Sequence, residues 1–175
     1  MVIIGDNLLG LIRQYEICNE RFYDNFSISI ELDKKYLKPK SFEKTGTIRY
    51  DLQNVDEYFE QQEMTSGHLV LKPGDAILGC STVAIKMPLG YMGWVQTKGS
   101  LARLFVASTC NDSQIEPGYN GRITLEIINY SPFNIELSYR SKVAQMYILK
   151  CSTSNSTPYS GRYQNALNPT IAQLP

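Results

Sequence analysis

Hydrophobic and polar residues alternate in short runs along most of this chain, the pattern of β-strands with one buried face. The alternating runs cover residues 26–32, 67–73, 75–87, 93–98, 122–130, 133–139 and 142–150. Turn residues separate them, for example Pro73-Gly74 and Pro117-Gly118, because proline and glycine adopt the backbone angles that tight turns require. The chain is therefore predicted to fold as a mostly β domain, either a barrel or a jelly-roll sandwich.

Helical spacing precedes the first of these runs. Asp6 is a suitable N-cap for a short helix, since its side chain can accept a backbone hydrogen bond at the helix start. The hydrophobic residues that share one face of this helix are Leu8, Leu9, Leu11, Ile12 and Tyr15. We expect a short N-terminal helix before the strands.

The C-terminal segment has a different composition. Residues 152–175 are rich in Ser, Thr, Asn, Pro and Tyr and show little periodicity. Such a segment has too few hydrophobic residues to form a core of its own. The predicted organisation is one β domain at residues 1–151, followed by a tail at residues 152–175 that either docks on something or stays loose.

The charge balance excludes some partners. The 175 residues include 17 Lys and Arg and 17 Asp and Glu, so no global basic field favours nucleic-acid polymers. No hydrophobic run reaches the roughly 18 residues of a membrane span. The first residues, MVIIGDNLLG, lack the basic flank and the cleavage site of a signal peptide. We expect a cytoplasmic protein with no membrane partner.

Cysteine and histidine are too sparse for a zinc site. Cys18, Cys80, Cys110 and Cys151 form no C-x-x-C pair, and His68 is the single histidine. Zinc sites need three or four such ligands at close spacing. We expect reduced cysteines, and hydrolytic chemistry that works without a metal-bound hydroxide.

The candidate chemistry lies between residues 93 and 126. Lys98, Gly99, Ser100 and Arg103 form a small cationic turn, and Glu126 is a lone carboxylate on a later strand. Exposed backbone N–H groups with an arginine and a hydroxyl suit a phosphate chain. A carboxylate on a rigid strand suits general acid–base chemistry. Together these features predict an enzyme that acts on a nucleotide.

Each of these residues also has a purely structural interpretation. In the run ITLEI, Thr124 and Glu126 lie on the strand face opposite Leu125, where a glutamate is ordinarily solvent-exposed. Arg103 by itself is typical of a surface or interface arginine. Tyr119 suits core or subunit packing as well as a binding site. The residue pattern alone leaves these alternatives open.

The order of several motifs resembles that of a known family. KGSLARL is similar to the signature R-S-S-L-A-R-L, and QIEPGYNGRITLEIIN is similar to R-I-D-P-G-[WFY]-x-G-x-I-T-L-E-x-x-N. KVAQMYI resembles a strand that carries the family's Gln, and PYSGRYQNALNPT resembles a tail that covers the nucleotide. Over nearly its whole length the chain resembles the dCTP deaminase branch of the dUTPase superfamily. The resemblance implies a dUTPase-like distorted jelly-roll or β-barrel with a short N-terminal helix.

The resemblance also implies roles for individual residues. Glu126 is the general acid–base that moves a proton from water to cytosine N3, so that hydroxide attacks C4 and dCTP becomes dUTP and ammonia without zinc. Arg103 and Ser100 hold the triphosphate. The implied substrate-binding residues are Lys98, Gly99, Ser100, Arg103, Glu116, Tyr119, Thr124, Leu125, Gln145, Tyr159 and Arg162. The family binds Mg²⁺ through the triphosphate and forms homotrimers with sites between subunits.

Several positions depart from the family pattern. Gly99 stands where deaminases keep a serine that positions the reacting water and ammonia. Asp112 replaces a small residue beside the base, where an extra carboxylate crowds the pocket and repels a triphosphate. The other departures are Ser29, Glu31, Lys98, Gln114, Glu116 and Ala166. Because several of these changes fall around one expected pocket, they leave room for activities other than deamination.

Two alternatives to the deaminase stay open. One is hydrolysis of the triphosphate, by a dUTPase or by a bifunctional enzyme that converts dCTP to dUMP, with Glu116 activating water. The chain lacks the Gly-rich C-terminal arm typical of dUTPases. The other is a non-catalytic nucleotide-binding relative, which Gly99 and Asp112 favour and which the retained Ser100 and Glu126 oppose. The identity of the base, cytosine, a modified cytosine or uracil, stays open as well.

Overall fold

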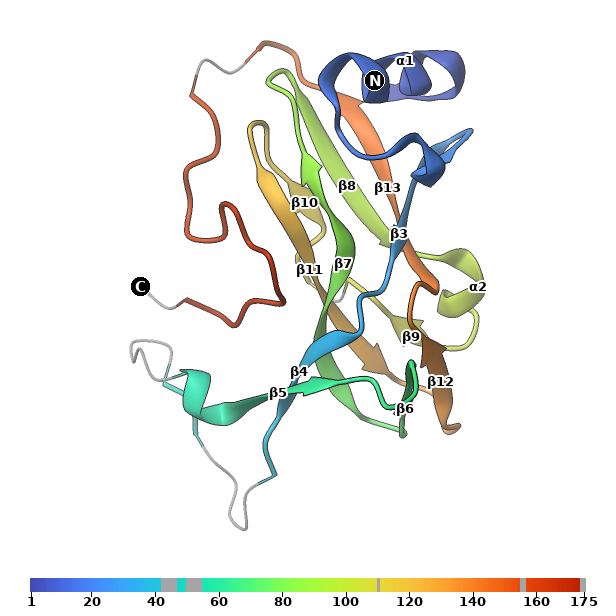
Figure 1. Cartoon of the computed structure of the whole chain (residues 1–175), viewed down its shortest axis with the longest axis vertical. Helices are drawn as coiled ribbons and strands as arrows, with labels where there is room; N and C mark the ends of the chain where they lie inside the picture. The colour runs from blue at the N-terminus through green and yellow to red at the C-terminus, as the bar shows by residue number, and fades with distance from the viewer. Residues whose placement is uncertain (42–46, 50–54, 110, 155–156, 174–175) are drawn as a thin grey trace.

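The computed structural model describes residues 1–41, 47–49, 55–109, 111–154 and 157–173, and its strands form two main sheets (Figure 1). The first sheet has the strand order β10, β8, β13, β3, β2, with β1 beside β13. Its strands are β1 (Val2–Ile3), β2 (Tyr23–Asp24), β3 (Ser27–Glu31), β8 (Tyr91–Thr97), β10 (Gln114–Ile115) and β13 (Lys142–Lys150).

The second sheet has the order β5, β4, β7, β11, β9, and β6 and β12 form a separate antiparallel pair. These strands are β4 (Lys35–Pro39), β5 (Phe59–Glu63), β6 (His68–Leu71), β7 (Ala76–Lys86), β9 (Val106–Ala107), β11 (Asn120–Asn129) and β12 (Ile135–Ser138). The helical segments are α1 (Gly5–Tyr15), η1 (Glu20–Phe22), η2 (Val55–Tyr58) and α2 (Gly99–Ala102).

The predicted mostly β fold with a short N-terminal helix is confirmed. Each alternating run of the sequence forms a strand, namely β3, β6, β7, β8, β11, β12 and β13. As described, the sheets do not close into a barrel, because the first ends at β10 and β2 and the second at β5 and β9. A bridge between Leu32 and Ser81 joins β3 to β7 where the two sheets meet. The open arrangement therefore replaces the barrel alternative.

The prediction that Asp6 caps α1 is wrong. The N-cap position is Ile4, which makes no side-chain capping bond, and Asp6 lies in the first turn. Gly5 donates its N–H to the Asn25 carbonyl at 2.7 Å, and the helix begins there, two residues earlier than an Asp6 cap predicts. Asp6 still interacts favourably with the positive end of the helix dipole. No helix in the described ranges has the length and apolar character to span a membrane.

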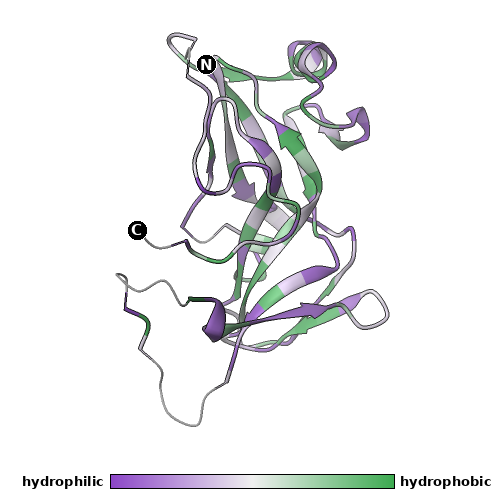
Figure 2. Ribbon diagram, turned by 60° about the vertical axis from the view of Figure 1, so that its left-hand side comes forward, coloured by the Kyte–Doolittle hydropathy of each residue, from purple (hydrophilic) through white to green (hydrophobic). Residues whose placement is uncertain are grey.

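Side chains from both sheets share one hydrophobic core. Ile30 and Met146 of the first sheet and Leu125 and Ile127 of the second are each at most 2% exposed. Burial of one such side chain contributes about 1.5–3 kcal/mol. Along β11 every second residue is buried and the others are half-buried, as the alternation predicts, and Figure 2 shows hydrophobic and hydrophilic segments alternating on the central strands. The half-buried face of β11 is the one that meets the C-terminal tail.

Candidate active site

A cavity of about 510 Å³ opens beside the half-buried face of β11. Thr124 and Glu126 of β11 line it, because residues two apart on a strand project from the same face. The tail contributes Thr170, Ile171 and Ala172 to the same lining. The remaining lining residues are Ile48, Val55, Phe59, Leu78, Val95, Asp112, Gln114, Ile115, Glu116, Tyr119, Ile123, Tyr159 and Tyr163. Residues from distant parts of the chain thus surround the predicted acid–base.

Glu126 is held by the loop that precedes β10. The backbone nitrogens of Asn111 and Asp112 each lie 3.4 Å from Glu126 Oε2, so both N–H groups donate long hydrogen bonds to one carboxylate oxygen. The arrangement orients the carboxyl group of Glu126 inside the cavity.

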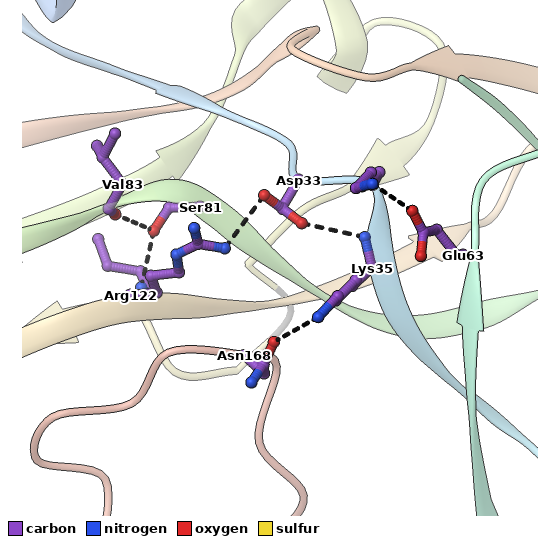
Figure 3. A network of polar contacts seen from close by, with 9 residues as sticks. Asp33, Lys35, Glu63, Ser81, Val83, Arg122 and Asn168 are labelled. Atoms are coloured by element: carbon purple, nitrogen blue, oxygen red, sulfur yellow. Dashed lines mark hydrogen bonds and ion pairs between the residues drawn. The ribbon is translucent and has the colours of Figure 1, made fainter. Parts of the chain in front are cut away.

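Three carboxylates and no basic side chain belong to the described lining of the cavity. Asp112 and Glu116 line it together with Glu126, and no described lining residue is Lys, Arg or His. Arg122, on the same face of β11, is directed elsewhere: its Nη1 lies 3.1 Å from Asp33 Oδ2 (Figure 3). A triphosphate in this cavity therefore needs positive charge from another source.

Two tyrosines form an aromatic side of the cavity. The rings of Tyr119 and Tyr159 have centroids 5.8 Å apart at an interplanar angle of 58°. The Tyr119 hydroxyl donates to the Arg122 carbonyl oxygen at 2.7 Å. Burial raises the pKa of Tyr119 to about 12, with smaller contributions from Tyr159 and Glu116, so the phenol stays protonated at neutral pH. Tyr119 is both a packing residue and part of the cavity wall.

The described part of the tail docks along β11. The Asn165 N–H donates to the Asn120 carbonyl at 2.7 Å, and the Arg122 N–H donates to the Ala166 carbonyl at 2.8 Å. These bonds satisfy β11 backbone groups on the edge that β7 leaves unpaired. Lys35 adds a contact from β4, where its Nζ lies 3.4 Å from Asn168 Oδ1 (Figure 3).

A pair of threonines fixes the tail at the cavity itself. The Thr170 N–H donates to Thr124 Oγ1 at 3.1 Å, and the two hydroxyl oxygens lie 2.9 Å apart. Either hydroxyl can donate to the other, because a hydroxyl oxygen that accepts one hydrogen bond keeps a second acceptor position and its own hydrogen. This contact lies two residues from Glu126 along the same strand face.

A Thr170→Val variant is expected to loosen the tail. The change removes one hydroxyl–hydroxyl bond, typically about 0.5–1.5 kcal/mol, which corresponds to roughly two- to tenfold faster hydrogen exchange. The measurement is amide exchange of residues 165–173 in the variant and the wild type. Thr170→Ser keeps the hydroxyl and should exchange at the wild-type rate. Equal amide exchange rates in Thr170→Val and the wild type would show that the threonine pair does not hold the tail.

Arg162 and Tyr163 form hydrogen bonds within the tail. The Arg162 Nη1 donates to the Gln173 carbonyl, and the Gln173 N–H donates to the Tyr163 hydroxyl at 3.2 Å. Tyr159 and Tyr163 line the cavity, whereas Arg162 does not. The structure thus separates Arg162 from the other tail residues around the cavity.

The predicted phosphate-binding turn lies apart from this cavity. Lys98 precedes α2 and its Nζ is 3.7 Å from Asp24 Oδ2, while Arg103 Nη1 donates to the Gly99 carbonyl at 2.9 Å. Ser100 and Arg103 are exposed. None of these residues lines the cavity, and Figure 1 shows α2 on the far side of β13 from the tail.

Gln145 and Leu125 are also outside the cavity lining. Gln145, on β13, donates from Nε2 to the Tyr147 hydroxyl at 2.7 Å. The side chain of Leu125 is buried in the core, so only its backbone can face a ligand. The predicted site residues that line the cavity within a single chain are therefore Glu116, Tyr119, Thr124, Glu126 and Tyr159.

Sequence reasoning missed several residues of the cavity. Val55 and Phe59 come from η2 and β5, which carry no recognisable motif, and Ile171 belongs to a tail without periodicity. The sequence marked Asp112 only as a departure from the family pattern. No sequence feature predicted that its backbone N–H contacts Glu126. In the described ranges no group of three or more His, Cys, Asp and Glu side chains is arranged to hold a metal.

Comparison with known proteins agrees with the fold and the motifs. Residues 6–151 match the family described as dCTP deaminase-like. A protein named dCTP deaminase, dUMP-forming, from Mycobacterium ulcerans is 31% identical over 151 residues, which cover 82% of this chain and 78% of that protein. One of the same name from Halobacterium salinarum is 26% identical over 156 residues, or 85% of this chain and 78% of that protein.

A solved structure is similar in fold. The 2'-deoxycytidine 5'-triphosphate deaminase from Agrobacterium tumefaciens superposes with a TM-score of 0.61 at 19% identity, over 84% of this chain. This chain spans 47% of the length of that chain. The family match over residues 6–151 and the 31% identity to the Mycobacterium ulcerans protein establish the family of this chain. The chain belongs to the dCTP deaminase-like family.

Proposed function

We propose that this chain deaminates dCTP by hydrolysis to dUTP and ammonia, with Glu126 as general acid–base. The observation that carries the proposal is the environment of Glu126. It is a half-buried strand carboxylate that lines a cavity of about 510 Å³ and accepts two backbone N–H groups. Family membership supports the same substrate class.

In the proposed reaction Glu126 moves protons between water and the base. Its carboxylate accepts a proton from a water molecule and passes it to cytosine N3, while the resulting hydroxide forms a bond to C4. Glu126 then takes the proton of the new C4 hydroxyl group and gives it to N4. The C4–N4 bond breaks, and ammonia leaves as the C4 carbonyl of uracil forms. General acid–base catalysis of this kind contributes about 10²–10⁴-fold in rate. Backbone groups of Thr124 and Leu125, beside Glu126 on β11, are suited to hold the edge of the base.

The triphosphate needs cations that the described cavity lining does not supply. In the proposed homotrimer, α2 of a second copy supplies Arg103, Ser100 and Lys98. Two observations support this arrangement: Ser100 and Arg103 are exposed, and the described lining of the chain's own cavity has no basic residue. A site completed by two subunits would combine the cavity residues around Glu126 with the phosphate-binding residues of α2.

Mg²⁺ fits this site only as a companion of the nucleotide. The described residues offer no group of three ligands for a protein-held ion, and Mg²⁺ is commonly bound through substrate phosphates with one or two carboxylates. When bound, Mg²⁺ offsets the negative charge of the triphosphate. Glu116 is a cavity carboxylate available to it.

A second candidate function is the conversion of dCTP to dUMP. Glu116 favours it, because this carboxylate lines the same cavity as Glu126 and could activate water for attack on a phosphate. Relatives of this chain carry the name dCTP deaminase, dUMP-forming. The two candidates differ in whether the diphosphate is released after deamination.

Product analysis separates these functions. Purified protein is incubated with Mg²⁺ and either dCTP or dUTP, and ammonia, dUTP, dUMP and diphosphate are resolved. We expect dCTP to yield equal amounts of ammonia and dUTP. Ammonia with dUMP and diphosphate would support the second candidate. Binding of either nucleotide without any product would contradict both and support a non-catalytic nucleotide-binding protein.

A further inference from the structure

Asp112 adds an unusual carboxylate beside the reacting one. Its own backbone nitrogen is one of the two that lie 3.4 Å from Glu126 Oε2. The side chain of Asp112 therefore leaves the backbone directly beside Glu126, and the residue lines the cavity while remaining exposed at its rim. Any group bound next to Glu126 meets Asp112 as well.

The carboxylate of Asp112 is not used by the fold. Within the described residues it makes no hydrogen bond and no ion pair, and Arg122, a basic residue on the same face of β11 as Glu126, is engaged by Asp33 at 3.1 Å. An ionised carboxylate has acceptor positions and no hydrogen to donate. A ligand that enters between Asp112 and Glu126 is therefore favoured when it presents a donor on that side.

The two classes of pyrimidine differ in this respect. Cytosine carries an N4 amino group, a donor, next to the N3 acceptor, whereas uracil and thymine carry the O4 acceptor at the same position. Carboxylates of Asp and Glu accept hydrogen bonds from cytosine N4 in nucleic-acid recognition. Against O4, the carboxylate of Asp112 has no hydrogen to share, so the two acceptors face each other without a hydrogen bond.

We propose that Asp112 is the residue that selects the amino-bearing pyrimidine, by accepting a hydrogen bond from N4 of the base. This inference rests on the proposed function, because it requires N3 of the base to face Glu126. In this arrangement the Asp112 carboxylate lies at the base end of the site, where it selects the base instead of repelling the triphosphate. Deamination replaces N4 by O4, so the same contact favours release of the uracil product.

Equilibrium binding tests the role of Asp112. The Glu126→Gln background removes turnover, so dissociation constants for dCTP, dUTP and dTTP can be measured by titration calorimetry with Mg²⁺. We expect this background to prefer dCTP over dUTP and dTTP by about tenfold or more, the factor that one hydrogen bond to a charged group represents. Adding Asp112→Asn or Asp112→Ala should remove most of that preference.

Glu116→Gln in the same background is the matched control. It removes another carboxylate from the same cavity, so it should change the affinities for dCTP and dUTP by similar factors and leave their ratio unchanged. An unchanged ratio in both Asp112 variants would overturn the selective role of Asp112 while leaving the proposed function intact. Failure of the folded background protein to bind dCTP at all would overturn the proposed function and this inference together.

Discussion

Replacing Glu126 with Gln is expected to reduce ammonia release from dCTP by about 10²–10⁴-fold, the usual contribution of a positioned acid–base group. Glutamine keeps nearly the same shape and can still accept the N–H groups of Asn111 and Asp112. It cannot take a proton from water at neutral pH. The variant should therefore bind dCTP with an affinity close to that of the wild type, and the loss should appear in kcat.

Steady-state kinetics and dCTP titration on the same preparation check this expectation. Glu136→Gln is the control, because Glu136 is also a strand glutamate, on β12, and it is exposed outside the cavity. The control should retain wild-type kcat. Wild-type turnover in Glu126→Gln would show that another group carries the protons, and a loss of binding without a change in kcat would assign Glu126 a purely structural role.

Replacing Arg103 with Ala is expected to weaken binding of the triphosphate by about 10–100-fold, the range for a lost hydrogen bond to a charged group. The exposed guanidinium now donates to the Gly99 carbonyl at 2.9 Å, a weak neutral partner that a phosphate can replace. dCTP affinity should fall much more than deoxycytidine affinity, since the nucleoside has no phosphate. Arg103→Lys should recover part of the loss, because it keeps the charge without the bidentate geometry.

Arg13→Ala serves as the control for Arg103. Arg13 is an exposed arginine on α1 that pairs with Glu20 at 2.8 Å, so its removal should leave nucleotide affinity unchanged. Equal affinity for dCTP in Arg103→Ala and the wild type would contradict the anchoring role.

Mixing two inactive or weakened variants tests whether two subunits share a site. Glu126→Gln and Arg103→Ala proteins are unfolded and reassembled together. At a dCTP concentration too low for either variant alone, the mixture should regain activity, whereas a site within one chain gives no recovery.

Much of the fold could be predicted because strand periodicity is a local property. The alternation in residues 122–130 correctly predicted which side chains of β11 are buried and which are half-buried. The strands β4 and β5 could not be found in this way. The sequence of β5, FEQQE, has a single hydrophobic residue, because an edge strand with one paired neighbour has little surface to bury.

The site was less predictable than the fold, since its parts meet across long stretches of chain. The cationic turn and Glu126 were both evident as motifs, and nothing in their spacing showed that α2 and the cavity lie apart within one chain. Arg122 lies on the same face of β11 as Glu126, and its contact with Asp33, 89 residues away, directs its positive charge away from the cavity. Likewise, Thr170 meets Thr124 over a separation of 46 residues.

The sequence by itself therefore determined the strands, the buried face of β11 and the identity of the candidate acid–base, because these depend on residue type and on neighbours along the chain. Only the tertiary structure decided which groups surround Glu126. The docked tail, the absence of a basic residue from the described cavity lining and the contact between Asp112 and Glu126 all depend on how distant segments pack. Local periodicity carries no information on that packing.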